Sequence, residues 1–128
     1  PELRAAIAAL PGRRLVFTNG DKAHADRVLA ALKLDDLFEA IFHIALADYV
    51  PKPHPRTFAR MVQAHDVDPA HAVFFEDSPR NLKPAFDLGM TTVLVGPDAL
   101  QSEDAFVHHR TDNLAAFLKA ARTQETRP

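Results

Sequence analysis

The sequence predicts an α/β fold in which helices cover both faces of a mostly parallel sheet, giving three layers. Segments with helical and strand-like patterns alternate along the whole chain and are joined by short links. The strand-like segments are short, continuous apolar runs, which are typical of strands buried on both faces. A chain of 128 residues that is 47% hydrophobic can form one packed core, so we expect a single domain over residues 1–128.

Each element is predicted from the spacing of its apolar residues and from turn or cap signals. Pro11-Gly12 ends the first helix, Asp35-Asp36 ends the second, and Gly89 suits the end of a later one. The expected helices cover 2–10, 23–34, 56–65 and 80–88, and a last one, capped by Asp112 or Asn113, precedes a polar, frayed tail from 123 to 128. The expected strands cover 15–17, 41–45, 72–75, 91–95 and, as a short edge strand, 105–109.

Composition and charge exclude several classes of function. The formal net charge is −2 and 25% of residues are charged, so bulk electrostatics give no reason to expect binding to nucleic acid or membranes. The chain has no cysteine, which excludes disulfides and thiolate chemistry and is compatible with the cytoplasm, where we expect the protein. No signal peptide or membrane-spanning run is visible. Pro1-Glu2 resembles the first turn of a helix, so we expect that a part of the protein upstream of Pro1 is missing.

Polar residues follow three of the predicted strands, where ligands bind in parallel sheets. Thr18, Asn19 and Gly20 offer a hydroxyl, an amide and a glycine backbone at the start of a helix, which is suited to an anion. The alternative is that Thr18 or Asn19 is an ordinary helix cap. Lys52 lies between two prolines that restrict its backbone, and its alternative is a solvated surface lysine in a rigid loop.

Glu76 and Asp77 follow a buried apolar run directly. Two adjacent carboxylates there repel each other unless a cation or hydrogen-bond donors compensate, and such oxygen ligands suit Mg²⁺. The alternative is that Asp77 or Ser78 caps the next helix, and both roles can coexist. The seven histidines show no ligand spacing, so we expect them to be solvated or packed, with His24 and His54 of most interest because they lie near the Thr18 loop and Lys52.

Taken together, Thr18-Asn19-Gly20, Lys52-Pro53 and Glu76-Asp77-Ser78 resemble motifs two, three and four of the haloacid dehalogenase superfamily. The amino-acid sequence around Thr18 to Ala25, with Asn81 following the third motif, is most similar to that of the pyrimidine 5′-nucleotidase branch. The resemblance implies a Rossmann-like core and a hydrolase that acts on phosphate monoesters. Its expected substrate is a small molecule, a nucleoside 5′-monophosphate.

The resemblance also implies roles for individual residues. Thr18, with Asn19 and Gly20, would bind the phosphoryl oxygens, and Lys52 would neutralise the phosphate and orient the nucleophile. Asp77 would bind Mg²⁺, with Glu76 assisting at the metal. Ser78, Asn81 and His24 are secondary candidates. These roles agree with the physics of phosphoryl transfer, which is catalysed mainly by positioning and by offsetting charge.

The chain departs from the family pattern at the first motif, an Asp-x-Asp sequence that supplies the nucleophile and the general acid/base. The single Asp-x-Asp here, Asp66-Val67-Asp68, is typical of a turn. We therefore expect the usual central nucleophile strand and the cap domain to be missing, the sheet to show a gap or altered pairing there, and the chain alone to be inactive. An exposed sheet edge could then favour a homo-oligomer.

Three alternatives stay open. The chain could be another phosphatase or a phosphomutase of the same superfamily, because the cap that selects substrates is absent. A haloacid dehalogenase is disfavoured because that reaction needs no Mg²⁺ and the Glu76-Asp77 pair would have no purpose. A non-catalytic anion-binding or interaction module, similar to response regulators or flavodoxins, is the remaining alternative, although receivers place the lysine after their acidic residues.

Overall fold

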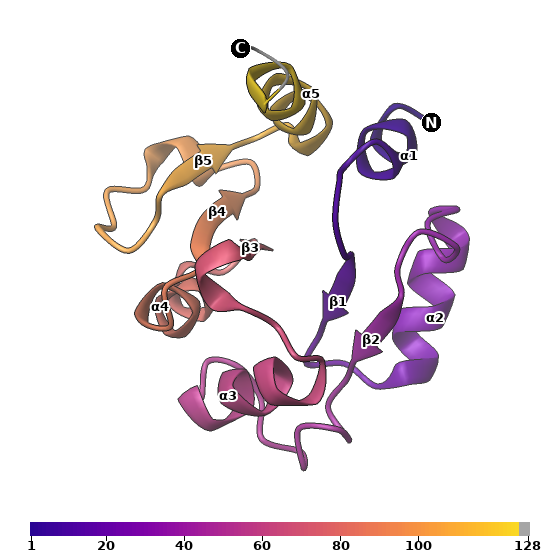
Figure 1. Cartoon of the computed structure of the whole chain (residues 1–128), viewed down its shortest axis with the longest axis vertical. Helices are drawn as coiled ribbons and strands as arrows, with labels where there is room; N and C mark the ends of the chain where they lie inside the picture. The colour runs from indigo at the N-terminus through magenta and orange to yellow at the C-terminus, as the bar shows by residue number, and fades with distance from the viewer. Residues whose placement is uncertain (126–128) are drawn as a thin grey trace. The chain divides into compact units, whose positions relative to one another are not determined.

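The computed structural model describes residues 1–125 and contains five α-helices and five strands in alternation (Figure 1). The helices are α1 (Glu2–Ala8), α2 (Lys22–Ala31), α3 (Pro55–Ala64), α4 (Pro79–Asp87) and α5 (Leu114–Glu125). The strands are β1 (Leu15–Phe17), β2 (Ala40–Phe42), β3 (Val73–Glu76), β4 (Thr91–Val95) and β5 (His109–Thr111), and the 3-10 helices are η1 (Pro69–His71) and η2 (Ala99–Gln101). The predicted α/β class is confirmed.

All strand pairs among the described residues are parallel, as expected, but they belong to two sheets. β1 pairs with β2 in one sheet, and β3, β4 and β5 follow one another in the other. Within residues 1–125 no ladder joins β1 to β3. The sheet was expected to show a gap or altered pairing, and the strands do fall into two sheets. That the central nucleophile strand is missing stays a prediction.

The chain divides into two compact units. The first unit comprises residues 1–49 and 114–128, and the second unit comprises residues 50–113. The candidate residues are thereby distributed: the Thr18 loop belongs to the first unit, whereas Lys52 and the Glu76-Asp77 pair belong to the second. The expectation of a single domain over 1–128 stays a prediction.

In the first unit, the two ends of the chain meet. Helix α1 packs against α5, and Lys119 contacts Glu2 at 2.6 Å. Arg4 donates two hydrogen bonds to Asp36, at 2.6 and 2.7 Å, and a third to the Lys33 carbonyl. The hydrogen bonds from Arg4 lower the pKa of Asp36 to about 2. These contacts connect α1 to the turn after α2.

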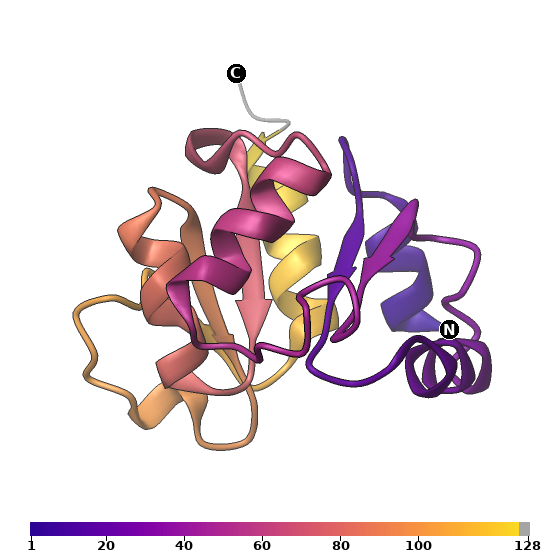
Figure 2. The ribbon, with the colours of Figure 1, turned by 90° about the horizontal axis from the view of Figure 1, so that it is seen from below.

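In the second unit, one apolar cluster joins the sheet to its helices. It consists of Leu82, Leu94, Ala99 and Val107, with Phe74 and Phe106 packed against them. Phe58 of α3 is fully buried and meets Phe74 of β3 edge to face, with ring centroids 5.6 Å apart, so that α3 lies along β3 (Figure 2). The unit therefore has a helical layer on its sheet, with Lys52 just before α3 and Glu76 at the end of β3.

The predicted edge strand over 105–109 is wrong in position, because β5 begins only at His109. The buried side chain of Thr92 accounts for the difference. Its hydroxyl donates to the Phe106 carbonyl at 2.7 Å and accepts from the His108 amide at 3.0 Å, while the Thr92 amide donates to His108 Nδ1. The chain before His109 is thus attached to β4 mainly through a side chain rather than a ladder.

Other boundaries also differ from expectation: α1 ends at Ala8 rather than at residue 10, and α2 ends at Ala31 rather than at residue 34. The predicted strand over 41–45 ends at Phe42, because the amides of Leu46 and Ala47 turn back to the His43 carbonyl. The tail expected to fray from Thr123 is helical as far as Glu125, and its remainder lies outside the described residues. None of these changes moves a candidate residue.

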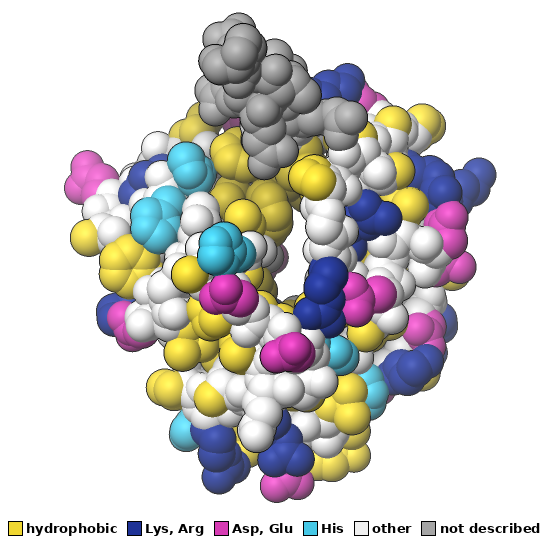
Figure 3. All heavy atoms as spheres, viewed as in Figure 1, with side chains coloured by type: hydrophobic (Ala, Val, Ile, Leu, Met, Phe, Trp, Pro, Cys, Tyr) yellow, Lys and Arg dark blue, Asp and Glu magenta, His cyan; other side chains and the backbone are white. Residues whose placement is uncertain are grey.

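Two observations concern membrane segments and the distribution of charge on one face of the described residues. Within residues 1–125, no helix has the length and apolar character that crossing a bilayer requires. On the face drawn in Figure 3, positive and negative side chains are interspersed among white and hydrophobic atoms. This distribution agrees with the small net charge of −2.

Substituting Thr92→Val should lower the free energy of unfolding by about 1–2 kcal/mol, because it leaves the Phe106 carbonyl without its donor inside the protein. Urea unfolding followed by circular dichroism measures the change. Thr91→Val is the matched control, since it makes the same substitution on the same strand at a partly exposed site. Equal effects of the two substitutions would contradict the role given to the Thr92 hydroxyl.

Candidate functional site

In the first unit, Thr18 continues the parallel ladder beyond β1 and turns its hydroxyl toward the loop. Its amide donates to the Phe42 carbonyl at 3.0 Å, and its Oγ1 accepts from the Gly20 amide at 3.0 Å. A hydroxyl that accepts one hydrogen bond still has its own hydrogen to donate. Thr18 can therefore donate to an anion placed at the carboxyl end of β1.

The interpretation of Thr18 or Asn19 as the helix cap is wrong, because Asp21 performs that function. Asp21 is the N-cap of α2, and its carboxylate accepts from the His24 amide at 2.7 Å. The Gly20 carbonyl in turn accepts from the Ile44 amide at 3.1 Å. The loop from Thr18 to Gly20 is thus fixed by its neighbours while the Thr18 hydroxyl is not used for capping.

His24 lies over this loop, as its position in the sequence suggested. A Cβ added to Gly20 would lie 3.3 Å from His24 Cδ2 and 3.4 Å from Thr18 Oγ1. A larger residue at position 20 would require the His24 ring to shift by a few tenths of an ångström, and glycine lets the loop backbone approach both side chains closely. The structure therefore brings Thr18, Gly20 and His24 together.

In the second unit, Lys52 and Glu76 form a buried ion pair. Lys52 Nζ and Glu76 Oε1 are 2.7 Å apart, and each side chain is only 8% exposed. The ammonium also lies 5.4 Å from the centre of the Phe74 ring, which adds a cation–π contact. The alternative of a solvated surface lysine is wrong.

Two side-chain hydrogen bonds position the loop that carries Lys52. Thr57, which is 1% exposed, donates from Oγ1 to the Val50 carbonyl at 2.6 Å. His54 is the N-cap of α3 and accepts from the Arg56 amide through Nδ1 at 3.1 Å. His54, which the sequence singled out because it lies near Lys52, therefore serves as the cap of α3. The Lys52-Pro53 peptide bond is cis.

The second oxygen of Glu76 accepts hydrogen bonds from the two backbone amides that directly precede the next helix. Glu76 Oε2 accepts from the amides of Asp77 at 2.9 Å and Ser78 at 3.0 Å. Ser78 occupies the N-cap position of α4, but its side chain makes no capping hydrogen bond. Ser78 is thus the N-cap residue by position, one of the two expected alternatives, while the Glu76 carboxylate binds the two amides that precede α4 and has both of its oxygens engaged.

The two carboxylates of the pair differ in pKa. Burial acts to raise the pKa of Glu76, but hydrogen bonds from Asp77 and Lys52 outweigh it and lower that pKa overall. The pKa of Asp77 is raised above its usual 3.8, first by its hydrogen bond to Glu76 and then by desolvation and the negative charge of Glu76. A cation beside Asp77 would offset this repulsion.

Asp77 is exposed and lines a hollow at the carboxyl ends of β3 and β4. The hollow measures about 430 Å³ and is lined by Asp77, Pro79 and residues that follow β4, among them Gly96 and Asp98. Asn81 lies on the first turn of α4 and is 9% exposed, and its Oδ1 accepts no hydrogen bond from the described residues. Of the two carboxylates, Asp77 is the one available to a ligand.

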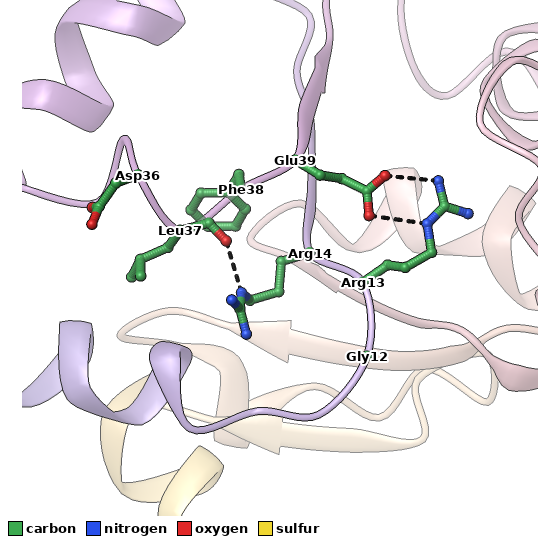
Figure 4. A pocket seen from close by; sticks show the side chains of 7 residues that line it. All are labelled: Gly12, Arg13, Arg14, Asp36, Leu37, Phe38 and Glu39. Atoms are coloured by element: carbon green, nitrogen blue, oxygen red, sulfur yellow. Dashed lines mark hydrogen bonds and ion pairs between the residues drawn. The ribbon is translucent and has the colours of Figure 1, made fainter.

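Another hollow, of about 330 Å³, lies in the first unit at the opposite end of its strands (Figure 4). There Arg13 pairs with Glu39 at 3.0 Å, and Arg14 donates to the Leu37 carbonyl at 2.7 Å. These residues directly precede β1 and β2, whereas ligands of parallel sheets bind beyond the carboxyl ends. We therefore assign this hollow to the packing of the strand starts.

A magnesium ion fits the chemistry of the second unit. Mg²⁺ is usually held by one or two carboxylates, waters and substrate phosphate, and Asp77 supplies one exposed carboxylate of that kind, whereas both oxygens of Glu76 are engaged. Within residues 1–125, no group of three or more His, Asp or Glu side chains is gathered closely enough to bind a metal by itself.

Sequence reasoning missed Phe74 and Thr57. Phe74 was expected as a core residue of β3, and nothing in its apolar context indicated that its ring would contact the ammonium of Lys52. Thr57 could have been found, because a threonine on the inward face of a predicted helix must bond its hydroxyl somewhere when it is buried.

Comparison with known proteins gives a family match over most of the chain. The model of the haloacid dehalogenase-like hydrolases matches residues 1–89. Among curated proteins, the glyceraldehyde 3-phosphate phosphatase of Pyrococcus furiosus is 32% identical over 81 residues, which are 61% of this chain and 32% of that protein. This chain thus spans about a third of the length of that relative.

Solved structures support the fold. A dehalogenase crystallised with an intermediate complex has a TM-score of 0.81 at 20% identity, covering 94% of this chain and 55% of that one. A predicted phosphoglycolate phosphatase from Haemophilus somnus has a TM-score of 0.72 at 24% identity, covering 94% and 54%. At these identities the likeness concerns the fold alone.

Substituting Lys52→Met should lower the free energy of unfolding by about 3–5 kcal/mol, because the buried Glu76 carboxylate loses its compensating charge. Urea unfolding at neutral pH measures the loss. Lys83→Met is the matched control, since Lys83 pairs with Asp87 on the surface and should cost about 0.5 kcal/mol or less. Adding Glu76→Gln to Lys52→Met should recover part of the stability, and a fully additive double variant would contradict a coupled pair.

The usual pKa of an aspartate is 3.8, and the pKa of Asp77 in the folded protein is raised above it. As the pH rises through this range, Asp77→Asn should become increasingly more stable than the native chain. The folded protein binds this proton more readily than the unfolded chain, so ionisation of Asp77 costs stability, and asparagine avoids that cost. Asp36→Asn should show the opposite trend, because the lowered pKa of Asp36 makes its ionisation stabilising. Unfolding titrations across the acid range measure both, and parallel trends would refute the assignment.

Proposed function

This chain belongs to the haloacid dehalogenase-like hydrolases, and we propose that it is the phosphate- and magnesium-binding part of a phosphate-monoester hydrolase. The observation that carries the proposal is the buried Lys52–Glu76 pair, 2.7 Å apart and directly followed by the exposed Asp77. Burying an ion pair costs desolvation free energy and is weak evidence for stability alone. A fixed ammonium next to a carboxylate of raised pKa suits the binding of phosphate together with a cation.

Each residue has a distinct role in this proposal. The Thr18 hydroxyl, with the Asn19 and Gly20 backbone, donates to phosphoryl oxygens. Lys52 neutralises phosphate charge, and Asp77 binds Mg²⁺, which offsets charge on the phosphoryl group when bound. Glu76, whose oxygens are both engaged, orients Lys52 and the start of α4 rather than binding the metal as a first ligand.

The secondary candidates have supporting roles. Ser78 lies at the N-cap of α4 with its hydroxyl free of capping, and Asn81 presents an amide oxygen that accepts no hydrogen bond from the described residues. His24 lies beside Gly20 in the other loop. We place all three around the bound phosphate or its metal, without a direct part in bond breaking.

The proposed substrate is a nucleoside 5′-monophosphate, on the sequence similarity around Thr18 and Glu76 to pyrimidine 5′-nucleotidases. A phosphorylated three-carbon compound is the second candidate, because the relative from Pyrococcus furiosus is a glyceraldehyde 3-phosphate phosphatase. Both substrates are small phosphate esters and would use the same phosphate-binding residues. We place the reaction in the cytoplasm and regard self-association through a sheet edge as a further prediction.

The chain alone should bind phosphate with Mg²⁺ but should not turn over substrate, because it has no Asp-x-Asp motif at a strand end to form the aspartyl-phosphate. Calorimetry with orthophosphate and Mg²⁺ should show binding that Thr18→Val and Lys52→Gln each weaken, and Asp77→Asn should remove the Mg²⁺ dependence. Titration with UMP, CMP and glyceraldehyde 3-phosphate then compares the two substrate classes.

Arg13→Gln is the matched control for these substitutions, since Arg13 lies at the other end of β1 and pairs with Glu39. Hydrolysis of an aryl phosphate by the chain, abolished by Asp77→Ala, would show that the nucleophile had been misassigned. Absence of any phosphate or Mg²⁺ binding in a folded sample would refute the proposed function itself.

A further inference from the structure

The Thr18 loop contains a chemically labile pair, Asn19-Gly20, at its most exposed point. Asn19 is exposed, whereas Gly20 is partly buried. Asparagine followed by glycine is open to deamidation, because glycine has no side chain to hinder attack by its own backbone nitrogen on the preceding amide. The same dipeptide is also one of the candidate phosphate-binding segments, so a change here would alter the proposed site.

The structure holds the attacking nitrogen in a hydrogen bond. The Gly20 amide donates to Thr18 Oγ1 at 3.0 Å, and the Gly20 carbonyl accepts from the Ile44 amide at 3.1 Å. To react, the Gly20 nitrogen must lose its hydrogen and move toward Asn19 Cγ. Both movements break the bond to Thr18, so the native loop opposes the reaction.

We propose that Asn19 is a spontaneous modification site that the Thr18 hydroxyl keeps in check. In the reaction, a bond forms between the Gly20 nitrogen and Asn19 Cγ, and the bond from Cγ to Nδ2 breaks. Nδ2 leaves as ammonia, which takes up the hydrogen lost by Gly20, and a succinimide remains. Water then opens the ring at one of its two carbonyls, giving aspartate or isoaspartate at position 19.

The product adds a negative charge beside the Thr18 hydroxyl. A unit charge about 4 Å from a bound anion weakens its binding roughly fivefold even in water, and more where water is excluded. This consequence rests on the proposed function, whereas the protection of Asn19 by Thr18 does not. The modification would therefore act as a slow, irreversible loss of phosphate binding with age.

The experiment measures the rate of deamidation at Asn19 in the full chain, by peptide mapping with mass spectrometry after incubation at mildly alkaline pH. Thr18→Val should deamidate roughly two- to tenfold faster than the native chain, the factor that corresponds to one lost hydrogen bond. Thr18→Ser, which keeps the oxygen, should match the native chain. The native chain unfolded in urea gives the unprotected rate and should be the fastest.

Each result separates the inference from the proposed function. Equal rates in the native chain, Thr18→Val and urea would overturn the protection by Thr18, whatever the chain binds. If Thr18→Val is unfolded by circular dichroism, a native rate equal to the rate in urea would still overturn the protection. Asn19→Asp should bind orthophosphate at least fivefold more weakly than the native chain. Unchanged binding by Asn19→Asp would overturn the loss-of-binding consequence, and a native chain that binds no phosphate would refute the proposed function alone.

Discussion

The buried ion pair between Lys52 and Glu76 determines the arrangement of the second unit's candidate site. It fixes the lysine at the carboxyl end of β3, and the other oxygen of Glu76 accepts hydrogen bonds from the two amides that precede α4. Because the pair is only 8% exposed, solvent cannot replace either partner. One side chain thus links the loop before α3, the end of β3 and the start of α4, and leaves Asp77 as the carboxylate that faces a ligand.

The candidate anion site of the first unit is built differently. It brings together the Thr18 hydroxyl, the Gly20 backbone and the imidazole of His24, with the Asp21 carboxylate bound to the start of α2. Asp21 caps α2 and so releases the hydroxyl from that task. Under the proposed function, the first unit contributes the Thr18 hydroxyl and its loop backbone, and the second unit contributes Lys52 and Asp77.

The sequence was sufficient to predict the α/β class, the order of the elements and the strand ends at which polar residues gather, because these depend on local apolar spacing. It did not predict the burial of Lys52, since its partner lies 24 residues away and only folding brings the two together. The start of β5 was misplaced for a similar reason, because the Thr92 side chain replaces ladder contacts there. The division of the strands into two sheets required the strand pairing itself.

The contact between α1 and α5 has a consequence for the order of folding. The first unit is discontinuous in sequence, and it is completed only when residues after 113 return to the start of the chain. Closing so long a loop is entropically costly, whereas residues 50–113 form their contacts within one continuous stretch. On a growing polypeptide, the half with Lys52 and Glu76 can fold first, and the half with Thr18 has to wait for the last helix.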